Sequence, residues 1–144
     1  QATFSACFGE PFMPMHPGVY ADLLSEKMDQ HGSTAWLINT GWSGGSYGEG
    51  SRMKIKYTRA MLNAALDGQL DGVDFVKDER FGFEIPVSCP EVPAEVLQPK
   101  MTWANAEAYE AMADKLATMF NENFSRYKAG VSPEVNAAAP APLS

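Results

Sequence analysis

Two segments carry apolar residues every three or four positions, the spacing of one face of a helix. The first predicted helix begins at Pro17, where proline is tolerated, and ends before Gly32. Its apolar stripe consists of Val19, Leu23, Leu24 and Met28. The longest predicted helix, about 106–128, follows Asn105, whose side chain is suited to cap it. Its stripe, predicted to pack in the core, consists of Tyr109, Met112, Leu116, Met119, Phe120, Phe124 and Tyr127.

Other segments have the patterns of strands. Residues 3–8 and 35–38 are short apolar runs and are predicted to be buried strands. Residues 52–57 alternate between basic and apolar side chains, which predicts a strand with one face in the core and one cationic face. Residues 73–76 and 81–87 resemble short strands. With the helices, these strands predict a mixed α/β fold.

The remaining segments are a short helix, a connector and a tail. A helix is predicted over about 59–67, with Thr58 as its N-cap and Gly68 at its end. A proline-rich connector is expected over 90–99. Residues 129–144 have low complexity, and a disordered tail is predicted there.

The composition is that of one acidic globular domain. The chain has 144 residues, with 11 Lys and Arg against 18 Asp and Glu, for a net charge of −7. This balance argues against binding to nucleic acid or to an anionic membrane surface. No apolar run approaches the roughly 18 residues of a membrane-spanning helix, and no secretion signal is visible. The sequence therefore predicts a cytoplasmic protein with no membrane or nucleic-acid partner.

The cysteines and histidines offer little chemistry. Cys7 and Cys89 are too few for a disulfide framework, and both are predicted to be reduced thiols. Cys7 has aromatic neighbours and is expected to be a buried structural residue, not a nucleophile. Only His16 and His31 are present, and neither belongs to a metal-binding pattern. The sequence thus predicts neither a metal site nor a catalytic residue in this chain.

One cluster of charge stands out. Four of the 11 basic residues lie within eight positions, namely Arg52, Lys54, Lys56 and Arg59. They follow a loop, residues 41–50, in which every second residue on average is glycine. Backbone N–H groups of such a loop, next to cations, suit a phosphate or another small anion. The alternative is a solvated strand face whose charges provide solubility.

The loop is not a Walker-type phosphate loop. Gly45 and Gly50 have the spacing of that motif, but Ser51 and Arg52 follow where it requires Lys and then Ser or Thr. The dinucleotide-binding fingerprint also fails, because its third glycine is missing. The residues alone therefore predict an α/β domain with an anion-binding loop of unspecified ligand.

Several ordered blocks resemble the closing portion of ATP-dependent phosphoenolpyruvate carboxykinases. They are Thr3-Phe4-Ser5-Ala6-Cys7-Phe8-Gly9, His16-Pro17, Asn39-Thr40-Gly41-Trp42, Gly44, Gly45, Tyr47, Gly48, Gly50, Arg52-Met53-Lys54-Ile55-Lys56-Tyr57-Thr58-Arg59-Ala60 and Phe83-Glu84-Ile85-Pro86. The resemblance covers about residues 2–128. It implies that residues 1–128 are the C-terminal part of a nucleotide-binding domain, a mixed sheet with flanking helices, followed by the tail 129–144.

The resemblance also implies a function. The family converts oxaloacetate and ATP to phosphoenolpyruvate, CO2 and ADP, a step of gluconeogenesis that uses Mg²⁺ and Mn²⁺. By resemblance, Arg52 packs by the adenine, and Met53 and Thr58 line the nucleotide pocket. An arginine on a purine face is physically reasonable. Glu49 and Ser51 depart from the family pattern and make the local charge less positive.

The catalytic apparatus implied by the resemblance lies upstream in the family. The phosphate loop, metal ligands, catalytic lysine and oxaloacetate-binding arginine have no counterpart in the 144 residues. The chain alone is therefore predicted to be inactive, and its start at Gln1 is interpreted as a cut within a longer polypeptide. Two alternatives are a free-standing ATP-binding module without catalysis and a structural interaction domain with a solvated basic strand.

Overall fold

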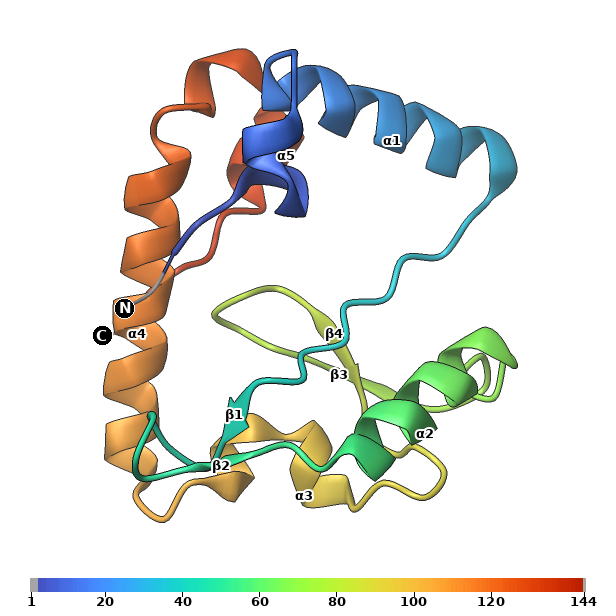
Figure 1. Cartoon of the computed structure of the whole chain (residues 1–144), viewed down its shortest axis with the longest axis vertical. Coiled ribbons are helices and arrows are strands. Elements are labelled where there is room, and N and C mark those ends of the chain that lie inside the picture. The colour runs from blue at the N-terminus through green and yellow to red at the C-terminus, as the bar shows by residue number, and fades with distance from the viewer. Residues whose placement is uncertain (1–2, 144) are drawn as a thin grey trace. The chain divides into compact units, whose positions relative to one another are not determined.

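Helices and small antiparallel sheets make up the chain (Figure 1). The computed structural model describes residues 3–143, except for the side chain of Phe8. Contacts divide the chain into unit 1, which is Gln1–Ala35 with Met119–Ala139, and unit 2, which is Trp36–Thr118 with Pro140–Ser144. The predicted mixed α/β class is confirmed.

Unit 1 is helical over its described residues. Its elements are the 3₁₀ turns η1 (Ala6–Phe8) and η2 (Glu10–Phe12), helix α1 (Pro17–His31), the end of α4 (Ala106–Phe124), the turn η4 (Lys128–Gly130) and α5 (Pro133–Ala137). The predicted first helix is confirmed with its start and end. The Nδ1 of His16 accepts a hydrogen bond from the Gly18 amide at 3.2 Å. Gly32 ends α1 in the left-handed conformation at φ 60°.

Unit 2 holds both sheets, each of two antiparallel strands. Strand β1 (Trp42–Ser43) pairs with β2 (Ser51–Arg52), with Ser43 opposite Ser51. Strand β3 (Phe75–Lys77) pairs with β4 (Glu84–Pro86), with Val76 opposite Ile85. Between the two sheets along the chain lies α2 (Ile55–Leu66), and after β4 come α3 (Ala94–Leu97), the turn η3 (Pro99–Thr102) and α4. The predicted strands at 73–76 and 81–87 are thus confirmed; β3 is shifted by one residue beyond the first range, and β4 lies within the second.

The core of unit 2 is small and is built around α2. Its buried members are Ala64, Leu70, Cys89, Val92 and Leu97. Partly buried side chains of α2 pack against them, including Tyr57, Ala60, Met61 and Ala65. Cys89 is buried as a free thiol, and this burial raises its pKa. The core therefore fixes one face of α2 and, with it, the position of the residues before the helix.

The predicted strand at 52–57 is wrong. Only Ser51 and Arg52 are in a strand, and α2 begins at Ile55 with Lys54 as its N-cap. Thr58, predicted as an N-cap, instead lies inside the first turns of α2. The reason is the period of burial: Tyr57, Ala60 and Ala64 share a buried face at helical spacing. Burial of this helical face stabilises the segment more than the six-residue alternation of basic and apolar side chains could stabilise a strand.

The predicted strands at 3–8 and 35–38 are also wrong. No described strand pairs with either segment, and a strand without a neighbour leaves its backbone groups unpaired. Residues 6–8 form η1, in which Cys7 has the left-handed φ of 49° and an exposed side chain. The expectation of a buried Cys7 therefore fails with the strand. In the second segment, Trp36 packs against the core cluster and lies 6.1 Å from the ring of Phe75.

The later part of the chain is more helical than predicted. Asn105 caps α4 as expected, because its Oδ1 accepts from the amides of Glu107 at 2.9 Å and Ala108 at 3.1 Å. The helix ends at Phe124, four residues before the predicted end. Its buried positions are the small residues Ala113 and Ala117, whereas Met112, Leu116 and Phe120 of the predicted core stripe are exposed. The connector at 90–99 contains α3, and residues 129–144 contain α5.

Candidate functional site

A hollow in unit 2 surrounds the start of the basic cluster. This cavity, the Arg52 hollow, has a volume of about 450 Å³, within the size range of small-molecule pockets. The hairpin β1–β2, the residues before α2 and the segment around α3 and η3 form its walls. Its lining residues are Ser43, Gly44, Glu49, Gly50, Ser51, Arg52, Met53, Lys54, Tyr57, Pro93, Glu95, Val96 and Thr102.

Tight backbone packing shapes the glycine-rich wall. A Cβ on Gly50 would lie 2.5 Å from the Gly45 carbonyl oxygen and 2.6 Å from that of Ser43. Those distances are far below any real Cβ contact, so only glycine fits at this position. The Gly50 amide also donates to the Ser46 carbonyl at 2.9 Å, and the Met53 amide to that of Gly41 at 3.0 Å. The loop therefore folds back on itself and fixes the backbone that carries Arg52.

The cationic side chains of the cluster have no ion-pair partner among residues 3–143. Arg52, Lys54, Lys56 and Arg59 are all exposed. The Lys54 and Lys56 ammonium groups lie 5.8 and 4.9 Å from the centre of the Tyr57 ring, within the range of a cation–π interaction. Unpaired cations at the start of a helix favour an anionic ligand, because the helix N-terminus carries a partial positive charge.

The structure brings together two of the three nucleotide residues that the sequence predicts. Arg52 and Met53 both line the hollow, beside the glycine-rich loop. Thr58 is half-buried in α2 one residue after Tyr57, and it is not among the lining residues. The role of all three in nucleotide binding stays a prediction.

Sequence reasoning missed the far wall of the hollow. Pro93, Glu95, Val96 and Thr102 lie 40 or more positions after Arg52 and carry no local motif. Glu95 and Glu49 add carboxylates to the lining, so the site has both signs of charge. A local pattern could not have found these residues, because only the packing of α3 and η3 brings them to the hairpin.

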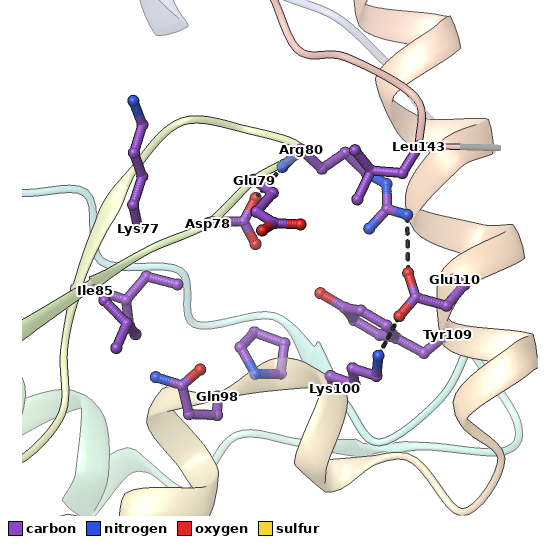
Figure 2. A pocket seen from close by; sticks show the side chains of 12 residues that line it. Lys77, Asp78, Glu79, Arg80, Ile85, Gln98, Lys100, Tyr109, Glu110 and Leu143 are labelled. Atoms are coloured by element: carbon purple, nitrogen blue, oxygen red, sulfur yellow. Dashed lines mark hydrogen bonds and ion pairs between the residues drawn. The ribbon is translucent and has the colours of Figure 1, made fainter.

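A second, smaller cavity lies between the β3–β4 hairpin and α4 (Figure 2). Its volume is about 190 Å³, and we call it the Arg80 pocket. Arg80 is buried, and its guanidinium donates to Asp114 at 2.6 Å and to Glu110 at 2.8 Å. Lys100 pairs with the other oxygen of Glu110 at 2.5 Å. This network ties the hairpin and η3 to the same turns of α4.

The ion pairs shift the pKa values of their members. Hydrogen bonds first from Lys100 and then from Arg80 lower the pKa of Glu110. Burial acts to lower the pKa of Arg80, but its bonds to Asp114 and Glu110 outweigh burial and raise it. Tyr109 also lines the pocket, and burial, followed by the charge of Asp78, raises its pKa. The network therefore remains charged at neutral pH, and its role is to hold the hairpin and η3 against α4.

Residues near the C-terminal end complete the Arg80 pocket. The Ala141 amide donates to the Arg80 carbonyl at 2.8 Å, and the Leu143 amide donates to Asp114 Oδ1 at 2.9 Å. Leu143 lines the pocket. These bonds hold part of the segment for which the sequence predicts a disordered tail.

Residues 3–143 contain neither a metal-binding cluster nor a membrane-spanning helix. Within that range, no three His, Cys, Asp or Glu side chains lie close enough together to hold a metal ion. Over the same residues, none of the helices has both the length and the apolar character needed to cross a membrane.

Comparison with known proteins decides the family. A family model described as phosphoenolpyruvate carboxykinase matches residues 1–95, more than half of the chain. The chain belongs to the phosphoenolpyruvate carboxykinase (ATP) family. The resemblance stated from the sequence blocks is thereby confirmed, and the match includes the glycine-rich loop and α2.

Individual members of the carboxykinase family are similar over nearly the whole chain. The phosphoenolpyruvate carboxykinase (ATP) of Geotalea uraniireducens is 58% identical over 135 residues, which cover 94% of this chain. The proteins of that name from Thermus thermophilus and Parvibaculum lavamentivorans are 54% and 55% identical, covering 97% and 98% of the chain. In each case the match spans only 26% of the relative's own length.

Proposed function

We propose that this chain forms the adenine side of the ATP site in a carboxykinase that converts oxaloacetate and ATP to phosphoenolpyruvate, CO2 and ADP. The observation that carries the proposal is the Arg52 hollow. In a member of this family, it combines a glycine-rich wall, unpaired cations and a volume of about 450 Å³. The free-standing ATP-binding module is the weaker alternative, because the relatives are named as carboxykinases.

The residues in and next to the hollow have distinct tasks in the proposed site. The Arg52 guanidinium is planar and weakly hydrated, so it stacks on the face of a purine. Met53 supplies a polarisable apolar surface that adapts to the ring. Lys54 and Lys56, at the start of α2, attract the phosphates electrostatically. Thr58, the third residue of the predicted nucleotide site, lies in the first turns of α2 next to Tyr57.

The chemistry itself belongs to groups outside these 144 residues. Phosphoryl transfer depends on positioning and on charge neutralisation by metal ions and cations near the transferred phosphate. The carboxykinase reaction is expected to use two divalent metal ions, Mg²⁺ and Mn²⁺, one with the nucleotide and one at the reacting centre, and no group of acidic, His or Cys side chains among residues 3–143 could hold either ion. This chain therefore contributes binding and orientation of ATP, and no step of bond making.

The rest of the same polypeptide is the proposed partner of this chain. Large apolar side chains are exposed on α1 and α2, including Val19, Leu23, Leu24, Leu62 and Leu66. Exposed apolar stripes of this size are typical of surfaces that another element covers. The matched relatives are about four times as long as this chain, and we assign residues 1–128 to their nucleotide-binding domain. The proposed location is the cytoplasm, where oxaloacetate and ATP are both available.

The proposal is tested by ATP titration of the full-length protein and two charge-matched variants. Arg52→Ala removes the residue that stacks on adenine and should raise the Kd for ATP about tenfold, the effect of about 1.4 kcal/mol. Arg59→Ala removes the same charge from α2 outside the hollow and should change the Kd less than about twofold. If both variants raise the Kd for ATP equally, Arg52 contributes only its positive charge, and the proposed stacking site is contradicted.

A further inference from the structure

We infer that Thr102 is a positioning residue of the ATP site, which holds the glycine-rich hairpin in the geometry that presents Arg52. The inference rests on the proposed function of the Arg52 hollow. Thr102 ends η3, 50 positions after Arg52, and the sequence around it has no nucleotide-binding pattern. Its hydroxyl and its carbonyl both contact the β1 side of the hairpin.

The first contact is a relay of two hydrogen bonds. The Ser43 hydroxyl donates to Thr102 Oγ1 at 3.2 Å, and the Thr102 hydroxyl donates its single hydrogen to the Pro99 carbonyl at 2.7 Å. Thr102 Oγ1 thus accepts a hydrogen bond from Ser43 of the hairpin, while its own hydrogen points to the Pro99 carbonyl of η3. Because the proton has one assigned acceptor, the oxygen lone pairs point in a defined direction. Ser43 is therefore held at one position relative to η3.

The second contact is backbone packing without any intervening side chain. Gly44 has the left-handed φ of 78°, and a Cβ there would lie 2.9 Å from the Thr102 carbonyl oxygen. Any other residue at position 44 would have a strained backbone, because of the positive φ, and a Cβ that clashes with this carbonyl. The hairpin thus rests directly on the end of η3. In Figure 1 the β1–β2 ribbon lies beside the segment that follows α3.

The pairing of β1 with β2 connects these contacts to Arg52. Ser43 pairs with Ser51, and Trp42 pairs with Arg52, so β1 carries the strand that holds the arginine. Each strand has only two residues, and a ribbon this short is marginal without external support. Ser43, Gly44 and Thr102 also line the hollow together with Arg52. Loss of the Thr102 hydroxyl should therefore shift or loosen Arg52 while the arginine side chain itself stays in place.

The test compares Thr102→Val, Thr102→Ser and Thr118→Val in the full-length protein. Valine has the shape of threonine without its hydroxyl, and serine restores the hydroxyl. Thr118 is a matched control on α4 whose hydroxyl donates to the Asp114 carbonyl at 2.9 Å, away from the hollow. Thr102→Val should raise the KM and the Kd for ATP about fivefold, the equivalent of one net hydrogen bond, with little change in kcat. Thr102→Ser should restore both constants, and Thr118→Val should leave them unchanged.

The outcomes separate this inference from the function on which it depends. If the protein binds ATP and Arg52→Ala weakens binding, but Thr102→Val does not, Thr102 has no positioning role. If Thr102→Val lowers kcat and KM together, or if serine does not rescue it, the relay is also refuted. If the unmodified protein does not bind ATP, the proposed function itself fails. Ser43→Ala adds an independent check, because its effect should not add to that of Thr102→Val.

Discussion

Replacing Arg80 with methionine should loosen the β3–β4 hairpin from α4. Arg80 is only 5% exposed, and it makes the two ion pairs that join the hairpin to this helix. Methionine keeps much of the apolar stem and removes the guanidinium. The change therefore isolates the charge network from simple loss of packing.

The expected magnitude follows from what remains at Asp114. Its side chain is only 13% exposed, and the substitution removes a guanidinium that lies 2.6 Å from its carboxylate. Removing one partner of a buried pair costs about 3–5 kcal/mol. The amide of Leu143 still donates to Asp114 Oδ1, which favours the lower end, about 3 kcal/mol. Such a loss corresponds to about a hundredfold increase in the population of the opened hairpin.

Hydrogen exchange in the full-length protein measures that opening directly. The amides of Asp78 and Gly82, which donate to Phe83 and Asp78 at 2.8 Å, report on the hairpin. Their exchange should accelerate about a hundredfold in Arg80→Met. Lys100→Met serves as the control, because Lys100 pairs with Glu110 but is 57% exposed, and exposed pairs contribute little. If the two variants accelerate exchange equally, the buried network does not hold the hairpin.

Three further predictions address the loop, the N-terminal turn and the isolated chain. Gly50→Ala should abolish ATP binding, because its Cβ overlaps the Gly45 carbonyl, whereas Gly72→Ala, which points into open space, should leave the Kd for ATP unchanged. The Tyr127 hydroxyl bond lowers the pKa of Glu10 below its usual 4.5. This contact therefore stabilises unit 1 above that pH and is lost as the pH falls through the lowered pKa. Hydrogen exchange around residues 125–130, corrected for its intrinsic pH dependence, should rise on acidification in the natural protein and show no such step in Glu10→Gln. Finally, residues 1–144 alone, supplied with oxaloacetate, ATP, Mg²⁺ and Mn²⁺, should form no phosphoenolpyruvate in a coupled assay, and sustained turnover would contradict the proposed division of labour.

The sequence predicted those features that depend on neighbouring residues. The caps at Gly32 and Asn105 were identified because a cap needs only its own side chain or φ and the adjacent amides. The hairpin strands near 75 and 85 were found for a similar reason, since turn residues bound both runs. Mixed α/β class followed from these elements.

Features that depend on distant parts of the chain were missed. Residues 54–57 alternate like a strand, but the core contacts of Tyr57 and Ala64 make the segment a helix. The candidate site shows the same limit. Its loop and Arg52 carry a local pattern, whereas Glu95 and Thr102 join it only through the packing of α3 and η3. Their residue types alone gave no signal of this role.

Photo-crosslinking with an azido-adenine analogue of ATP tests the central claim most directly. The full-length protein is labelled with the analogue, and the labelled peptides are mapped by mass spectrometry. We predict that the label attaches to residues that line the Arg52 hollow, in segments 43–57 and 93–102, and that excess ATP prevents it. Labelling that ATP suppresses but that falls entirely outside these segments would contradict the assignment of the adenine site to this chain.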